Sequence, residues 1–425
     1  MSQFERAPGL RQGQDRALAR YLRNQVAPYS PFHGHQLAGR RLAGREDLAE
    51  LPLTRLEELT DPADLVLRPT PEALSRSPER DIRLRWWWAR LRGRTGAFNR
   101  KVLEPRYKPV HWHSEAVPIG YSAEDLDQLA EVGRAGLEMA GVASTDVMVS
   151  VYPPGPSLCF WQVQLGARRA GVAALFLSNE ATADEVARLR PTVLAGRQAD
   201  LVRLLDGGRG SGLSFADLHT LLVLGQPLDP ARRDRLADMA GSPSGPVAVV
   251  AAWAPPGVRA LWSECRDGID VHTWPAAEVL ELVDPLSGTP VPPGADGEVV
   301  WSPLGWKGSV VLRLRTGIYG SLEESPCVFC GRTTPRLRLV LSLPPFARVL
   351  DDDPQVELWQ AELRTHQGAE ELIVFLTPAV NGHPGRLLRQ LDRQLSVTQF
   401  VVVDRQTMRA RLEAAGEARV IDTRR

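Results

Sequence analysis

The stretch from Ser122 to Val151, SAEDLDQLAEVGRAGLEMAGVASTDVMVSV, indicates how this chain folds. Ser122 can cap a helix and Asp125 stands at the capping-box position, while Gly141 suits the residue just past a helix end. Apolar residues recur between them at helical spacing: Leu126, Leu129, Val132 and Leu137. The run 147–151, VMVSV, then predicts a buried strand. A helix followed directly by a buried strand is typical of an α/β protein.

The same alternation continues further along the chain. Apolar runs at 172–177, 192–195, 221–224 and 247–250 predict more strands, separated by stretches of helical periodicity. Strands that alternate with helices predict a mainly parallel sheet covered on both faces. The glycine-rich run 207–212, GGRGSG, follows a helical pattern, so we interpret it as a flexible loop and not as a phosphate cradle.

Three regions flank this predicted α/β core of residues 106–255. Residues 1–105 have the pattern of polar helices with loops, and residues 256–343 change to strands with turns. Residues 344–425 predict a small α+β domain. The sequence therefore indicates a large N-terminal domain over residues 1–343 and a small C-terminal domain. The elements expected in the last two regions are strands at 279–283 and 298–301, and a strand, helix and strand at 371–376, 386–395 and 400–403.

The composition excludes several classes of protein. The chain has 425 residues, with 51 Lys and Arg against 51 Asp and Glu, so the balanced charge predicts no strongly acidic or basic partner. Four cysteines argue against a disulfide scaffold. No apolar run approaches the roughly 18–20 residues of a membrane span, and the opening MSQFER lacks the layout of a signal peptide. Scarce lysine with abundant arginine, alanine and proline indicates a bacterial genome rich in G and C. From the other features we expect a cytoplasmic protein that does not bind membranes.

Three of the four cysteines, with one histidine, have the spacing of a metal site. Cys265 and His272 are seven residues apart, and Cys327 and Cys330 form a CxxC motif. Thiolate pairs at this spacing, joined by a distant cysteine and histidine, suit tetrahedral Zn²⁺, so we predict a structural zinc. Two alternatives stay open: reduced thiols packed in a turn, and a redox CxxC, although no thioredoxin-like strand and helix precede it.

Two further features lie between the N-terminal helices and the core. His111 and His113 place two imidazoles on one side of a strand, but without a third ligand we favour an ordinary loop over a metal pair. Residues 83–94, RLRWWWARLRGR, mix cations with aromatics, a combination that can bind nucleic acid. We favour instead a helix with its tryptophans packed on the core and its arginines outward. A protein-partner surface is the remaining alternative, because exposed Trp and Arg are typical of binding hot spots.

Several segments, in order along the chain, resemble phenylacetate–CoA ligase-like proteins. The close matches are VDPLSGTPVPPG at 283–294, GEVV at 297–300, LRTG at 314–317 and CGRTTPR at 330–336. Further matches are YSPF at 29–32, EDL at 46–48, LPLT at 51–54, GYS at 120–122 and ARVID at 418–422. No single motif decides the resemblance, but the ordered set is specific and spans about residues 16 to 425.

The resemblance implies the fold of the adenylate-forming enzymes: a large N-terminal domain with mainly parallel sheets and a β-rich part, and a small α+β C-terminal domain. Enzymes of this family join a carboxylic acid to AMP and then pass the acyl group to coenzyme A. The large domain holds acid and ATP, and the small domain swings between the two half-reactions. Some members also look similar in carrying a Cys…His pair followed by a second cysteine cluster.

Residues 109–117, PVHWHSEAV, stand where the family's phosphate-gripping loop is expected. That loop is rich in Ser, Thr and Gly and ends in Lys-Pro, because a triphosphate needs converging backbone N–H groups and a cation. Here Pro109 has no N–H, Trp112 is bulky, and Glu115 stands near the expected lysine, where a carboxylate would repel phosphates. A shortened or merely divergent loop is the alternative.

Three more positions and the hinge depart from the family pattern. Residues 251–255, AAWAP, replace a segment with an aromatic residue, a Thr and a Mg²⁺-binding Glu, and they supply no side-chain oxygen. Ile318 stands where an Asp accepts hydrogen bonds from the ribose. Glu417 stands where a lysine stabilises charge during adenylation, although a one-residue slip would bring Arg419 there. The hinge region 342–346, SLPPF, carries two prolines that would stiffen it.

These joint losses lead to our main hypothesis, a protein that no longer forms adenylates. It would act as a non-catalytic binding or partner protein that uses neither ATP nor Mg²⁺ and has no catalytic residues. Its partner would be another protein, a second copy of the chain or a small carboxylic acid. The alternative is an active ATP-dependent carboxylate–AMP or carboxylate–CoA ligase with relocated contacts. A second alternative is nucleic-acid binding through residues 83–106.

Overall fold

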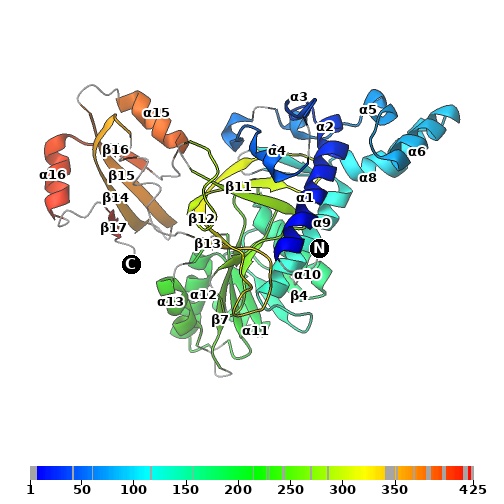
Figure 1. Ribbon diagram of the computed structural model, residues 1–425. Helices are drawn as coiled ribbons and strands as arrows, with labels where there is room; N and C mark the ends of the chain where they lie inside the picture. The colour runs from blue at the N-terminus through cyan, green and yellow to red at the C-terminus, as the bar shows by residue number, and fades with distance from the viewer. Residues whose placement is uncertain are drawn as a thin grey trace. The chain divides into compact units, whose positions relative to one another are not determined.

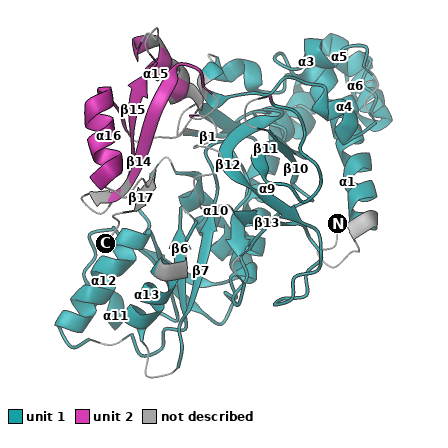
Figure 2. Cartoon of the chain, turned by 60° about the vertical axis from the view of Figure 1, so that its left-hand side comes forward, with its two compact units in different colours: residues 1–284, 288–339 teal, residues 285–287, 340–425 magenta. Residues whose placement is uncertain are grey.

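The computed structural model describes residues 7–40, 43–59, 61–114, 117–155, 157–213, 215–225, 227–228, 230–241, 245–268, 270–284, 287–339, 350, 353–366, 369–379, 384–394, 399–414 and 420–422. Two compact units divide the chain (Figure 2). The first comprises Met1–Asp284 and Gly288–Leu339, and the second comprises Pro285–Ser287 and Val340–Arg425. Our predicted boundary after residue 343 and the hinge region 342–346 lie outside the described residues.

The core of the first unit is one sheet of eleven strands, in the order β10-β11-β12-β13-β9-β8-β7-β6-β5-β3-β4. The last five strands of that order run parallel, which confirms the predicted parallel sheet. Both β5 and β6 are buried along their whole length, as uninterrupted apolar runs require. The bounds are β3 Val147–Ser150, β4 Ala173–Phe176, β5 Val193–Gly196, β6 Thr220–Leu224 and β7 Ala248–Trp253.

Helices cover both faces of the parallel half (Figure 1). One face carries α9 Ala123–Met139 and α10 Leu158–Ala170, and the other carries α11 Ala183–Arg188, α12 Gln198–Gly210 and α13 Pro230–Ala240. The predicted capping box begins α9: the Ser122 Oγ accepts the Asp125 N–H at 3.1 Å, and the Asp125 carboxylate accepts the Ser122 N–H at 3.0 Å. This local signal therefore positions α9 as the sequence predicts.

Two glycines allow α9 and α10 to pack in close contact. A Cβ atom on Gly133 would lie 2.0 Å from the carbonyl oxygen of Gln162. A Cβ atom on Gly166 would lie 2.4 Å from the carbonyl carbon of Gly133. Because these neighbours are backbone atoms, only glycine permits the observed distance between the two helices.

The glycine-rich run 207–212 corrects our prediction of a flexible loop. The helix α12 continues through Gly210, and the chain leaves it at Ser211 and Gly212, where φ is 66°. Gly208 is buried, and a Cβ atom there would lie 3.3 Å from the Phe215 ring. The apolar periodicity of α12 and this close packing outweigh the low helix propensity of glycine.

The six remaining strands of the large sheet are antiparallel and form the predicted β-rich part. The pairs β7–β8, β8–β9 and β9–β13 join it directly to the parallel half, so the two predicted regions share one continuous sheet. The bounds are β8 Trp262–Glu264, β9 Val271–His272, β10 Glu278–Val283, β11 Gly297–Pro303, β12 Leu314–Glu323 and β13 Arg336–Leu339.

Helices fill the N-terminal part of the first unit, and a two-stranded hairpin follows them. The helices are α1 Ala7–Tyr21, α2 Ala27–Tyr29, α3 Gly34–Leu37, α4 Arg45–Ala49, α5 Pro71–Ser75, α6 Arg80–Leu91, α7 Thr95–Phe98 and α8 Glu104–Tyr107. Single π-helical turns cover Leu22–Val26 and Asn99–Leu103, and 3-10 turns cover Leu56–Glu58 and Pro62–Leu65. The hairpin strands are β1 His111–Ser114 and β2 Pro118–Tyr121.

The tryptophans of α6 correct a second prediction. Trp86 is buried against Phe98, with ring centroids 5.7 Å apart. Trp87 and Trp88 are instead 44% and 57% exposed, so the prediction that the tryptophans pack on the core is wrong for two of the three. Each residue of a helix is turned by about 100° from the one before it, so three consecutive tryptophans cannot share a face.

The second unit is a small α+β fold built on a four-stranded sheet, in the order β16-β15-β14-β17. Its predicted strand, helix and strand correspond to β15 Ala369–Pro378, α15 Pro384–Gln394 and β16 Gln399–Val402. Three elements have no counterpart in the sequence prediction: β14 Val356–His366, α16 Arg405–Ala414 and β17 Val420–Asp422. Across the described part of the chain, no helix is both long and apolar enough to span a bilayer.

Candidate metal centre and ATP-site positions

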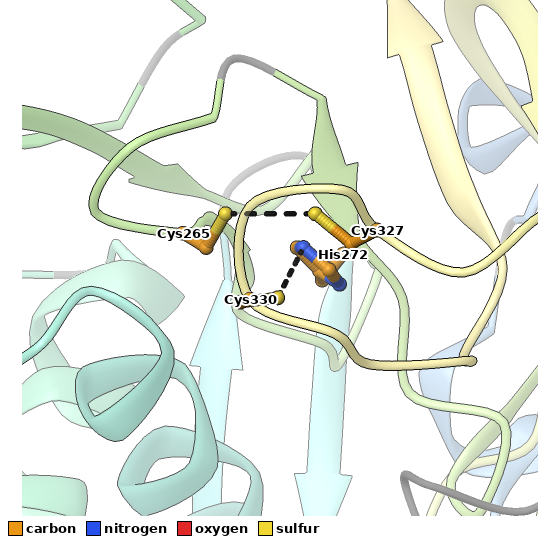
Figure 3. A group of neighbouring side chains, drawn as sticks. All are labelled: Cys265, His272, Cys327 and Cys330. Carbon is orange, nitrogen blue, oxygen red and sulfur yellow. Dashed lines mark hydrogen bonds between the residues drawn. The ribbon is translucent and has the colours of Figure 1, made fainter.

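The four predicted metal ligands converge in the first unit (Figure 3). Cys265 directly follows β8, His272 ends β9, and Cys327 and Cys330 lie in the loop between β12 and β13. One ligand atom from each residue lies within 4.8 Å of all the others. The structure therefore brings together residues that are about sixty positions apart in sequence, at the place where the two halves of the sheet join.

The distances within this cluster suit a tetrahedral ion. The Sγ atoms of Cys265 and Cys327 are 3.9 Å apart, and the Sγ of Cys330 lies 3.6 Å from Nε2 of His272. Zinc–sulfur bonds of about 2.3 Å and zinc–nitrogen bonds of about 2.0–2.1 Å give tetrahedral edges of about 3.8 Å and about 3.6 Å. The spacing also exceeds the roughly 2.05 Å of a disulfide bond, and the cysteines are free.

Local backbone geometry holds the CxxC loop. The Cys327 carbonyl accepts the Gly331 N–H at 2.8 Å, and the Cys327 N–H donates to the Arg332 carbonyl at 2.8 Å. Gly331 has φ of 72°, a left-handed conformation that side chains disfavour. These contacts direct both thiols of the loop inward, whereas Val328 and Phe329 between them are 85% and 58% exposed.

Burial sets the protonation of the ligands. The Cys265 pKa is raised to about 12, first by burial and then by the neighbouring Cys330 and Cys327 sulfurs. Burial also acts on Cys327, but the backbone N–H groups of Cys330 and Phe329 outweigh it and lower the Cys327 pKa. The His272 pKa falls to about 4, because burial and then Arg336 and Arg332 disfavour the imidazolium. The centre thus offers a neutral imidazole and one stabilised thiolate.

The cluster has the features of a closed site. Cys265, His272 and Cys327 are at most 3% exposed, and four protein ligands fill all the positions of a tetrahedral ion. Beside them, Arg336 pairs with Asp270 at 2.9 Å and stands opposite His272 in the β13–β9 ladder. The Nδ1 atom of His272 is buried without a hydrogen-bond partner among the described residues.

At the phosphate-loop position, the chain forms the β1–β2 hairpin. The register pairs His111 with Tyr121 and Ser114 with Pro118, so only residues 115–117 connect the strands. Glu115 itself lies outside the described residues. His113 is buried and its pKa falls to about 4, through burial first and His111 second. Among the described residues no third ligand joins these two histidines, because the only group of three or more candidate metal ligands is the cysteine cluster.

At the position of the Mg²⁺-binding segment, residues 251–253 end strand β7 and are buried. The Trp253 ring packs edge-on against Trp262, with centroids 5.3 Å apart. The nearby carboxylate belongs to Glu264, which pairs with Arg233 at 2.6 Å and accepts the Ala251 N–H at 2.7 Å. The side chains of this segment therefore serve the core of the sheet.

At the ribose position, the described contacts are internal to the sheet. The Arg315 guanidinium pairs with the buried Glu298 carboxylate, with Nε 2.8 Å from its oxygen. The Thr316 hydroxyl donates to the Val299 carbonyl at 2.7 Å and accepts the Ile318 N–H at 3.1 Å. The Ile318 side chain is partly buried and packs against the main apolar core. Glu417 and Arg419, at the fourth position, lie outside the described residues.

Comparison with known proteins shows which proteins the chain resembles. No protein-family model matches the chain. Over 303 residues the chain is 26% identical to the phenylacetate–coenzyme A ligase of Thermus thermophilus, covering 70% of this chain and 61% of the relative. Over 204 residues it is 25% identical to the Escherichia coli protein of that name, covering 47% and 46%. The chain therefore spans less than two thirds of either relative.

The structural match covers more of the chain than the sequence matches do. A crystal structure of 2-hydroxyisobutyryl-CoA ligase with 2-HIB-AMP and CoA superimposes with a TM-score of 0.63, covering 99% of this chain and 91% of the ligase at 16% identity. In sequence the chain resembles phenylacetate–CoA ligases, and these matches together support its membership of the adenylate-forming superfamily.

Sequence reasoning missed two buried charged residues of the first unit. Arg259 is 1% exposed, and its guanidinium lies over the rings of Tyr121, Trp301 and Trp306 at 5.2–5.9 Å, without a hydrogen-bond partner among the described residues. Glu278 accepts N–H groups from Trp262, Trp274 and Trp301, yet burial raises its pKa to about 7. Neither belongs to a motif, and only the fold brings their aromatic neighbours together, so the sequence carries no signal for them.

Proposed function

We propose that this chain is a non-catalytic member of its superfamily, which binds a partner or a small carboxylic acid but does not form adenylates. The observation that carries the proposal is the β1–β2 hairpin, in which three residues connect Ser114 to Pro118. A triphosphate is held by several backbone N–H groups that converge from a glycine-rich loop. A three-residue connection without glycine supplies no such loop.

The two other described positions support the same proposal. Trp253 contacts Trp262, and Ile318 packs on the core. Neither side chain has an oxygen that could bind Mg²⁺ or accept hydrogen bonds from ribose hydroxyls. The nearest charged groups are already paired, Glu264 with Arg233 and Arg315 with Glu298. Each missing contact should weaken ATP binding by about 1–3 kcal/mol. We therefore expect ATP affinity to be at least about a hundredfold below that of a working ligase.

The cysteine cluster supports a second part of the proposal, a structural Zn²⁺. Its ligand set of three cysteines and one histidine suits zinc, and its edges match those of a tetrahedral site. When bound, the ion would neutralise the thiolates and link the β8–β9 turn to the β12–β13 loop. With four protein ligands, it would have no open position for a substrate, which argues for stability as its role.

ATP–pyrophosphate exchange with a broad panel of carboxylic acids tests the proposal. The Thermus thermophilus phenylacetate–coenzyme A ligase serves as the positive control with phenylacetate. We expect exchange at the level of a blank without protein for every acid. Robust exchange with any acid would overturn the proposal in favour of the alternative that the relatives' names suggest, an active acid–AMP or acid–CoA ligase with relocated ATP contacts.

A further inference from the structure

The helix α6 has two apolar faces, and the fold uses only one of them. Ile82 and Trp86 are buried on the inner face. The opposite face, here called the outer stripe, consists of Leu84, Trp87, Trp88 and Leu91. Their exposed fractions are 46%, 44%, 57% and 75%. Large apolar side chains that share one uncovered face indicate a binding surface rather than isolated exposure.

The spacing of the outer stripe is that of an amphipathic helix. Its members stand at i, i+3, i+4 and i+7, so they share one face over two turns. At about 100° per residue, this face is centred opposite Ile82 and Trp86. The arrangement cannot be explained by docking on the rest of the unit, because the inner face already packs against Phe98. In Figure 1, α6 lies at the edge of the first unit, beside α5.

Cations surround the outer stripe. Residues 80–101 contain eight of the chain's 51 Lys and Arg residues but only one of its 51 Asp and Glu residues. Arg90 and Arg83 stand along one edge of the stripe, where Arg83 also donates to the Ser77 carbonyl at 2.6 Å. Arg85 stands along the other edge, where it pairs with Asp81 at 3.5 Å. The balanced charge of the whole chain therefore hides a strongly basic segment at this exposed apolar surface.

Two arginines hold the exposed indoles in place. The Arg90 guanidinium lies 5.7 Å from the Trp87 ring centroid, and the Arg92 guanidinium lies 5.0 Å from that of Trp88. Such cation–π pairs keep cationic and aromatic groups together at the surface. Trp beside Arg is also the combination found where proteins contact the boundary between lipid headgroups and acyl chains.

We propose, in place of our expectation from the sequence that the chain does not bind membranes, that the outer stripe of α6 is a peripheral membrane surface that lies on bilayers rich in anionic lipids. The apolar stripe would enter the headgroup boundary, and the arginines along both edges would contact lipid phosphates. A second copy of the chain fits poorly, because a two-fold contact would bring the cationic edges together. Nucleic acid fits poorly, because Leu84 and Leu91 have no ring for bases to stack on. The proposal does not depend on the state of the ATP site.

Vesicle flotation tests this proposal with the full chain. We expect the protein to float with vesicles of equal parts phosphatidylcholine and phosphatidylglycerol at low salt, and not with phosphatidylcholine alone. The double variant Trp87→Ser, Trp88→Ser should bind at least about tenfold more weakly. Replacing Arg85 by Ala should weaken vesicle binding by roughly fivefold, which is the usual effect of removing one cation near an anionic lipid surface.

A matched control is Trp112→Ser, since Trp112 is 46% exposed but lies on β1. This variant should float like the unaltered chain. Circular dichroism must show the same helix content for all variants, and Arg85→Ala, which removes no apolar contact, tests the proposal if the double variant fails to fold. The proposal is overturned if the chain does not float, or if the outer-stripe variants float like Trp112→Ser. It is also overturned if those variants instead abolish a dimer or binding to a single-stranded oligothymidine.

Discussion

The cysteine cluster and the ATP-site positions are two regions of one unit with opposite outcomes. In the cluster, four side chains from two distant segments aim their ligand atoms at one point. At the ATP positions, the described side chains turn to the core of the fold or to each other. Both regions depend on the same sheet, so the contrast is not a general loss of structure. The contrast supports our proposal that the scaffold is kept without a working ATP site.

The strongest test of the contrast removes a metal ligand. Cys327→Ser should lower the bound metal from about one equivalent towards none and destabilise the fold by about 4 kcal/mol or more, because metal binding is coupled to folding. Metal analysis and thermal unfolding measure the two effects. The matched control is Cys159→Ala, a buried cysteine outside the cluster, which should cost about 1 kcal/mol and leave the metal in place. Equal effects of the two variants would contradict a metal centre at these four residues.

A smaller perturbation targets the packing around the cluster. A Cβ atom on Gly268 would lie 2.9 Å from the Cys265 Sγ and 2.9 Å from the Phe329 ring. Gly268→Ala should therefore displace a ligand, weaken metal retention against a chelator, and destabilise the fold by about 2 kcal/mol. Gly155→Ala is the control, because a Cβ atom there meets nothing within 4 Å. If chelator resistance is unchanged in Gly268→Ala, the sulfur position does not matter to the site.

Restoring the single ribose contact at position 318 should not restore ATP binding. Ile318→Asp returns the ribose-binding carboxylate of the family, but Ile318 packs on the core, so the change should cost about 1–2 kcal/mol without producing ATP binding. Ile318→Val, which keeps the position apolar, should cost less than about 1.5 kcal/mol. Unfolding curves and Mg·ATP titrations measure both. Saturable ATP binding by Ile318→Asp would mean that the rest of the site is intact.

Because His113 is buried in the β1–β2 hairpin, we expect the stability of the fold to depend on pH. The His113 pKa is about 4 in the fold, below the usual value near 6.5, so the unfolded chain binds more protons between these values. The stabilisation from neutral His113 is complete above about pH 6.5 and is lost as the pH falls towards 4. Between pH 7 and 5 the unaltered chain should lose about 2 kcal/mol more stability than His113→Phe. Parallel losses would show that His113 is solvated and that the hairpin is not a packed element.

Local signals explain which parts of the structure the sequence could predict. Ser122 and Asp125 begin α9 through contacts within one turn, and the apolar runs of β5 and β6 need no distant partner to be recognised. The candidate metal ligands could be named because cysteine is scarce in this chain.

Other features depend on distant contacts and could not be predicted. Val271 and His272 form a two-residue strand without any periodicity, yet this strand joins the two halves of the large sheet. The helix α6 carries apolar residues on two opposite faces, one with Trp86 and the other with Trp87 and Trp88, so spacing alone cannot say which face is buried. Arg259 carries no signal of burial, because only the fold brings its three aromatic neighbours together.

The most direct test of the central claim is a calorimetric titration of Mg·ATP into the metal-loaded chain. One protein sample then tests both regions, the candidate metal centre by its metal content and the ATP-site positions by the heat of binding. We predict about one equivalent of zinc and no saturable heat with ATP at concentrations up to several millimolar. Saturable binding with a Kd tighter than about 1 mM would contradict the claim that the ATP site has been lost.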